Sequence, residues 1–125
     1  MALLVKLGDN MKKINIVKES NDFNNIIRTN RAFKYKDFVI YVERKEPSIY
    51  KFGIAVPRKI GNAVIRNKIK RRIKNIIDKK DYKNDFNCII IVGKGILTRS
   101  FEEMSDYLYE ALFKLNLIKE TSNEK

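Results

Sequence analysis

The sequence contains no histidine and only one cysteine among its 125 residues. Histidine is the commonest general base and metal ligand in proteins, and it activates the nucleophile of most serine and cysteine hydrolases. A single cysteine also excludes the usual structural zinc sites. Because Cys88 lies within an isoleucine-rich run, we predict that it is a reduced core thiol of a cytoplasmic protein.

Long apolar runs are also missing. The longest internal run, residues 88–92, has the length of a strand and falls far short of the ~20 residues of a membrane-spanning helix. Residues 1–10 are too short and too interrupted to be a signal peptide. Met11 looks like a natural start, so we expect residues 1–10 to be a poorly ordered extension or a segment foreign to the native chain. We expect no membrane partner.

Positive charge is what the sequence has in excess. The 27 lysine and arginine residues outnumber 15 acidic ones, which leaves a formal net charge of +12. This charge repels itself in a compact chain, and a polyanionic partner is the simplest reason to carry it. Nucleic acid is favoured over an anionic membrane surface. At this length the chain is one domain, expected at residues 11–118 and followed by a polar tail at 119–125.

The positive charge is densest in residues 58–74, where eight of seventeen side chains are basic and none is acidic. Isoleucines recur there at helical spacing, namely at Ile65, Ile69, Ile73, Ile76 and Ile77. The pattern predicts a helix over residues 62–78 with an apolar face for the core and an opposite, basic face. Like charges repeat every four residues at a cost of a few tenths of a kcal/mol per pair. An ordinary solvated face is therefore disfavoured, and a phosphate backbone is the expected ligand.

Weaker signals outline the rest of the chain. Residues 20–29 have helical spacing, and residues 37–44 and 50–56 alternate as strands do. The unbroken apolar run at 87–92 is typical of a central strand that is covered on both faces. With residues 50–56 and the basic helix it forms a βαβ unit. A capping box of Ser100 and Glu103 begins a last helix whose apolar positions predict core packing.

An aromatic groove is the second candidate binding surface. Gly53 and Ala55 are small and leave a shallow depression on one face of their strand, which permits close approach by a helix or a ligand. If the strands at 37–44 and 50–56 pair, Tyr41 lies near this depression. Tyr41 is then either a stacking platform for a base or a partly buried core side chain. Exposed aromatic side chains suit an unpaired nucleic-acid strand, whose bases can stack.

Residues 59–71, KIGNAVIRNKIKR, closely resemble the signature box of the protein component of bacterial ribonuclease P. The resemblance extends over residues 13–117. It implies an α+β two-layer sandwich, in which three helices and a mixed four-stranded sheet follow the order αβββαβα, as in domain 2 of ribosomal protein S5. It also implies a left-handed βαβ crossover, whereas pattern alone predicts the common right-handed one.

The resemblance further implies that the chain pairs with a large catalytic RNA that removes the 5′ leader of precursor tRNA. The RNA holds the Mg²⁺ ions and performs the hydrolysis, so no catalytic residue and no metal ligand are expected on this chain. The expected partners are that RNA and precursor tRNA, with no DNA. Without the resemblance, a non-catalytic ribosomal or tRNA-binding protein is the alternative. A stand-alone metal nuclease is disfavoured, because the acidic residues of the last helix have the spacing of a solvated face.

The resemblance assigns site residues by their position in the sequence, and these residues form two groups. The basic helix and its preceding loop are expected to bind RNA through Arg58, Lys59, Asn62, Arg66, Asn67, Lys68, Lys70, Arg71 and Lys74. The leader cleft is expected to be lined by Phe23, Ile27, Phe33 and Tyr41. Two positions depart from the family pattern: the family often has an aromatic residue at Ile27 and an arginine at Lys68. The first departure removes a stacking ring, and the second keeps the charge but loses bidentate geometry.

Overall fold

The structure is a computed structural model that describes residues 16–17, 20–46 and 49–119. In these ranges the main elements are α1 (Ser20–Thr29), β1 (Phe33–Tyr35), β2 (Phe38–Arg44), β3 (Lys51–Ala55), α2 (Ala63–Asp78), β4 (Phe86–Val92) and α3 (Phe101–Lys114). Two short 3-10 helices, η3 (Arg58–Ile60) and η4 (Lys94–Thr98), precede α2 and α3. The predicted order αβββαβα is confirmed. The predicted extension at residues 1–10, and all of the predicted tail beyond Lys119, lie outside the described residues.

The four strands form one mixed sheet in the order β1-β2-β4-β3. β2 pairs antiparallel with both β1 and β4, and β3 pairs parallel with β4. The direct pairing of β2 with β3 that we considered does not occur, because β4 lies between them. β4 is thus one of the two inner strands, as its unbroken apolar run predicts. Its neighbouring residues Ile89 and Ile90 point to opposite faces of the sheet, and both are fully buried.

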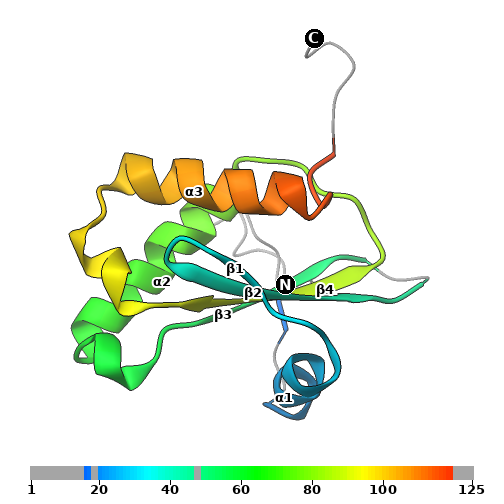
Figure 1. Ribbon diagram of the computed structural model, residues 1–125, viewed down its shortest axis with the longest axis horizontal. Helices are drawn as coiled ribbons and strands as arrows, with labels where there is room; N and C mark the ends of the chain where they lie inside the picture. The colour runs from blue at the N-terminus through cyan, green and yellow to red at the C-terminus, as the bar shows by residue number, and fades with distance from the viewer. Residues whose placement is uncertain (1–15, 18–19, 47–48, 120–125) are drawn as a thin grey trace, which may run out of the picture.

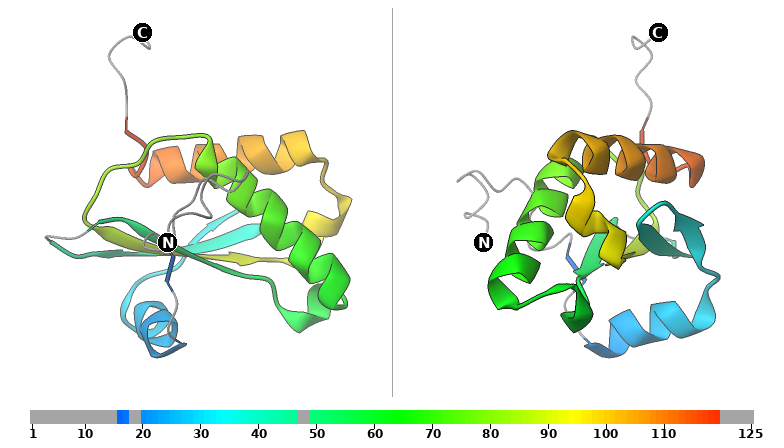
Figure 2. Two further views of the ribbon diagram at one scale, coloured as in Figure 1. Left: turned by 180° about the vertical axis from the view of Figure 1, so that it is seen from behind. Right: turned by 60° about the vertical axis from the view of Figure 1, so that its left-hand side comes forward.

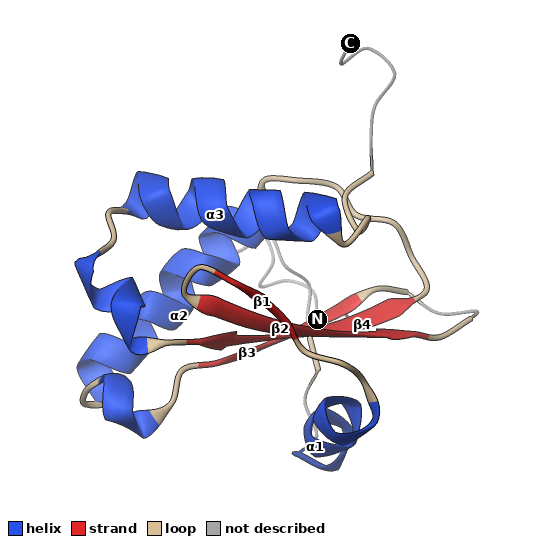
Figure 3. Ribbon diagram, in the orientation of Figure 1, coloured by secondary structure: helices blue, strands red, loops and turns tan. Residues whose placement is uncertain are grey.

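Helices cover the two faces of this sheet unequally. α2 and α3 lie together on one face and form the two-layer sandwich with the sheet, while α1 lies alone on the other (Figures 1 and 3). Seen from the side of α2 with β3 and β4 pointing upward, β4 lies to the left of β3 (Figures 1 and 2). The crossover is therefore left-handed, which agrees with the resemblance and is opposite to the hand that the pattern alone favours.

The main core fills the space between the sheet and its two covering helices. It takes Ile69, Ile73, Ile76 and Ile77 from α2, and Met104, Leu108, Ala111 and Leu112 from α3. At one end Tyr50, Phe52, Tyr82 and Phe86 form an aromatic cluster with ring centroids 5.0 to 5.9 Å apart. Cys88 is buried in this core, and burial raises the pKa of its thiol. On the α1 side, a smaller apolar contact buries Ile26 and Ile89.

Local signals define where each of the two covering helices begins. The Asn62 side chain accepts a hydrogen bond from the Ile65 backbone N–H at 3.0 Å and caps α2. Ser100 and Glu103 form both hydrogen bonds of the predicted capping box on α3. Ile65 is less buried than the prediction of a core-facing isoleucine implies. This side chain lies in the first turn, packs against Gly61 and stays 39% exposed.

Candidate nucleic-acid interface

The outer face of α2 carries the expected row of cations. Asn67, Lys68, Lys70 and Arg71 are exposed there, and Lys74 is half-buried on the same helix. No carboxylate of the described residues forms an ion pair with Lys68, Lys70 or Arg71. These charges repel one another without neutralisation from within the described fold. The face is therefore ready to bind an external polyanion.

Two of the predicted RNA-binding side chains also hold the loop that precedes the helix. Arg66 is half-buried, and its Nε donates a hydrogen bond to the Gly61 carbonyl oxygen at 3.1 Å. Asn62 uses its side-chain oxygen as the cap of α2. The guanidinium of Arg66 keeps its terminal N–H groups, and the Asn62 amide keeps its NH₂. This arrangement fixes η3 against α2, so that exposed Arg58 and Lys59 extend the same basic surface.

The opposite face of the sheet carries the predicted groove. Tyr41, Ile89 and Gly53 stand in register across β2, β4 and β3, so their side chains share the face that α1 partly covers. The Phe23 ring of α1 lies over Gly53, where a Cβ would come within 3.0 Å of the ring. The element that approaches the depression over Gly53 is therefore a helix, α1. Phe23, Tyr41 and Ile27 are all half-buried, so the structure places two of the predicted aromatics on this face.

Phe33 is not part of this groove, and its assignment to the leader cleft was wrong. It pairs in register with Ile40, which is fully buried in the main core. Residues that pair in register point to the same face, so Phe33 lies on the α3 side of the sheet. There it packs against the main core and stacks on Tyr35 with the ring centroids 6.3 Å apart.

The groove and the basic helix meet at the β3 edge of the sheet. A cavity of about 210 Å³ lies there, lined by Ile16, Val17, Phe23, Phe52, Gly53, Ile54, Lys70 and Lys74. Lys70 and Lys74 thus stand on the flank of α2 that is nearest to the groove. A strand of nucleic acid that leaves the groove at this edge encounters two cations of α2 at once.

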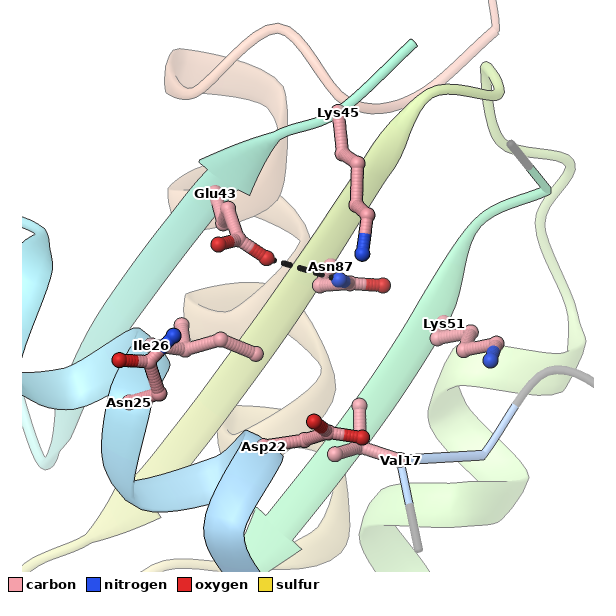
Figure 4. Close-up of a pocket in the computed structure, with 8 residues that line it drawn as sticks. All are labelled: Val17, Asp22, Asn25, Ile26, Glu43, Lys45, Lys51 and Asn87. Carbon is pink, nitrogen blue, oxygen red and sulfur yellow. Dashed lines mark hydrogen bonds between the residues drawn. The ribbon is translucent and has the colours of Figure 1, made fainter. Parts of the chain in front are cut away.

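Sequence reasoning missed a polar group at one end of the groove. Glu43 of β2 and Asn87 of β4 face the α1 side, where the Asn87 Nδ2 donates a hydrogen bond to Glu43 Oε1 at 2.9 Å (Figure 4). The available signal was alternation, because Glu43 lies two positions after Tyr41 and must share its face.

In the described part of the chain, no set of three or more His, Cys, Asp or Glu residues is placed to hold a metal ion. No helix in that part has the length and apolar character needed to span a membrane.

Comparison with known proteins gives one consistent result. A family model described as Ribonuclease P matches residues 11–116. The ribonuclease P protein component of Streptococcus pneumoniae (strain Hungary19A-6) is 36% identical over 115 residues, covering 90% of this chain and 93% of that protein. The structure is similar to that of the Staphylococcus aureus RNase P protein, with a TM-score of 0.76, 26% identity, and coverage of 86% and 100% of the two chains. The RNase P protein from Thermotoga maritima is similar with a TM-score of 0.67, 25% identity, and coverage of 73% and 88%.

Proposed function

Because this chain belongs to the ribonuclease P protein family, we propose that it is the RNA-binding subunit of a ribonucleoprotein endonuclease that removes the 5′ leader from precursor tRNA. Family membership itself implies part of an endoribonuclease complex and a role in tRNA processing. The finer proposal is a division of labour between two surfaces of this chain and an RNA partner, acting in the cytoplasm.

The observation that carries this proposal is that a basic helix face and a groove with two aromatic rings lie on opposite sides of one sheet. The cations of α2, which no described carboxylate neutralises, bind the phosphates of the catalytic RNA. The groove beside α1 holds the single-stranded leader, with Tyr41 and Phe23 as the rings against which bases stack. The two surfaces meet at the β3 edge. One protein thereby contacts the enzyme RNA and the part of the substrate that is absent from mature tRNA.

The catalytic groups belong to the RNA partner in this proposal. The chemistry that Mg²⁺ would supply when bound to that RNA is activation of the attacking water and stabilisation of the leaving oxygen. The protein contributes binding and orientation, which suits a sequence without histidine. Its positive charge also offsets the repulsion between two RNA molecules that must come together, so its effect is greatest when magnesium is scarce.

Reconstitution tests this function directly. The purified chain is combined with the catalytic RNA from the same genome and a 5′-labelled precursor tRNA at low magnesium. We expect release of the intact leader when both components are present, and no cleavage by the protein alone. Cleavage by the protein alone would overturn the division of labour. Equal cleavage by the RNA with and without the protein would overturn the subunit assignment.

The groove assignment gives a separate prediction for Tyr41→Ala. Loss of one base-stacking ring is expected to lower the affinity of the reconstituted enzyme for precursor tRNA about tenfold. Affinity for mature tRNA should not change, because mature tRNA has no leader. Binding of both RNAs is measured with Ca²⁺ in place of Mg²⁺ to suppress cleavage. The matched control is Tyr107→Ala, a half-buried tyrosine on α3. An equal loss of affinity for both RNAs would remove Tyr41 from the leader site.

A further inference from the structure

Two cations converge on one aromatic ring where the β1–β2 turn meets η4 and α3. The Nζ of Lys36, in the turn, lies 5.0 Å from the centre of the Tyr107 ring on α3, and the Cζ of Arg99 lies 5.1 Å from the same centre. Lys36 is exposed, and Arg99 and Tyr107 are half-buried. We call these three residues the turn cluster. Cations beside an accessible ring are typical of surfaces that bind single-stranded nucleic acid, where the cations hold phosphates and the ring supports a base.

The guanidinium of Arg99 is held in place by Asp37, the second residue of the turn. The Nε of Arg99 donates to Asp37 Oδ2 at 2.6 Å, and the Asp37 side chain is only 10% exposed. Asp37 is in turn fixed against η4. Its backbone oxygen accepts a hydrogen bond from the Gly93 N–H at 2.8 Å, and a Cβ on Gly95 would lie 2.2 Å from its carboxylate. Because the ion pair uses Nε, the terminal N–H groups of an oriented, planar guanidinium are left for a phosphate.

The backbone of Lys36 is an independent observation. Tyr35 pairs with Phe38, so Lys36 and Asp37 form a two-residue hairpin turn, and the φ of Lys36 is 53°. Glycine is the residue that favours a positive φ at the first of two turn positions. A lysine there strains the backbone, and such strain is typical of functional sites. Lys36 forms no ion pair with a carboxylate of the described residues, so charge pairing within the fold does not explain its presence.

The turn cluster continues the basic surface of α2 around one end of the sheet. η3, with exposed Arg58 and Lys59, contacts η4, which carries exposed Lys94. η4 in turn contacts the β1–β2 turn through the hydrogen bond from Gly93 to Asp37. The right-hand view of Figure 2 shows η4 between α2 and this turn. An RNA that lies on α2 and η3 therefore has the turn cluster next in its path, whereas the leader groove lies on the other face of the sheet.

We propose that the turn cluster binds one unpaired nucleotide of the catalytic RNA, with the base on Tyr107 and the phosphate between Lys36 and Arg99. The inference rests on the proposed function and adds a contact with the same RNA partner beyond α2. Duplex RNA is excluded as the ligand, because its bases are stacked within the helix, whereas an unpaired nucleotide presents both a base face and a phosphate. In this role Tyr107 contacts the enzyme RNA and not the tRNA, so its replacement leaves the tRNA affinity of the assembled enzyme unchanged.

A Lys36→Gly variant separates this role from a structural one. Glycine suits the positive φ of the turn, so the thermal midpoint should stay the same or rise. Affinity for the purified catalytic RNA should fall about fivefold, and the slope of log K against log salt should fall by about 0.7 to 0.9. Lys80→Gly is the matched control, because the Lys80 Nζ also lies 5.0 Å from the centre of a tyrosine ring, that of Tyr109, outside the turn cluster. The control should leave affinity and slope nearly unchanged.

A Tyr107→Leu variant tests the contact with the base. Leucine keeps an apolar side chain against the main core but removes the ring. Affinity for the catalytic RNA should fall about tenfold, the scale of one stacked base, while the salt slope stays the same because no phosphate contact is lost.

The outcomes of the two variants distinguish this inference from the proposed function. Parent affinity in either variant would overturn the inference, and the proposed function stands if replacement of the α2 cations still weakens RNA binding. If replacement of the α2 cations has no effect either, the proposed function fails as well. Equal losses in Lys36→Gly and Lys80→Gly would mean that only total charge matters, which would also overturn the inference.

Discussion

Replacing Lys70, Arg71 and Lys74 together by alanine is expected to weaken binding of the catalytic RNA by roughly 100-fold near physiological salt. Each of these side chains lies on the outer half or the flank of α2 without a carboxylate partner in the described chain. Each neutralised phosphate adds about 0.7 to 0.9 to the slope of log K against log salt. The triple variant should therefore lower that slope by about two to three units.

Stability should not account for this loss of affinity. Alanine has the highest helix propensity, and removing Lys70 and Lys74 relieves a like-charge pair at four-residue spacing. Thermal denaturation should therefore give an unchanged or slightly higher midpoint. Binding is measured by titration between about 50 and 200 mM salt, where phosphate contacts change affinity steeply.

A second triple variant separates a local effect from an effect of total charge. Lys83, Lys114 and Lys119 are basic residues at or near the C-terminal end of α3, and none of them belongs to α2. Their replacement by alanine also lowers the net charge from +12 by three. We expect the slope to change by much less than one unit in this control. Equal changes in the two triple variants would mean that RNA binding depends on total charge and that α2 is not the docking surface.

The second large effect concerns stability. Phe52→Ala is expected to lower the free energy of unfolding by about 3 to 5 kcal/mol. Phe52 is 1% exposed, and its ring lies 5.0 Å from the ring of Tyr82 and 5.6 Å from that of Phe86. Truncation removes the contacts that fix β3 to the aromatic cluster and leaves a cavity among rigid rings. Domains are typically stable by about 5 to 15 kcal/mol, so a large share of the stability is lost.

Chemical denaturation with urea measures this change and its control. Phe113→Ala removes a ring of the same size that is 58% exposed on α3, and surface changes of this kind stay within about 0.5 kcal/mol. A loss below about 1.5 kcal/mol for Phe52→Ala would mean that neighbouring side chains refill the space. In that case the aromatic cluster would not be the anchor of β3.

The helices and the central strand were predictable because their signals are local. Asn62 and the isoleucine row determine α2 within one stretch of chain, and Ser100 with Glu103 determines the start of α3. The run that contains Ile89 and Ile90 has no polar face, so it had to be covered on both sides. The α2 part of the candidate site follows from the same local pattern of charge and apolar residues.

Local signals did not predict on which face of the sheet Phe33 lies, and they did not predict the order of the strands. β1 contains three residues, too few for alternation to define which face is buried, and a shift of one residue reverses every side chain. Its orientation is set by pairing with β2. In the same way a pocket beneath α1 joins Asp22, Glu43 and Asn87, which are far apart in sequence. Only the insertion of β4 between β2 and β3 brings them together.

That insertion also determines when the protein can fold during synthesis. Among the named strands, β3 pairs with β4 alone, and β2 gains its second neighbour only from β4. The ribosome delivers residues 86–92 after α2 has already emerged. Until then the isoleucine row of α2 has no sheet to cover, and an isolated helix of this length is marginal in water. About three-quarters of the chain must therefore be made before the basic face of α2 acquires a fixed shape, which makes recognition of that face a late event in the life of the polypeptide.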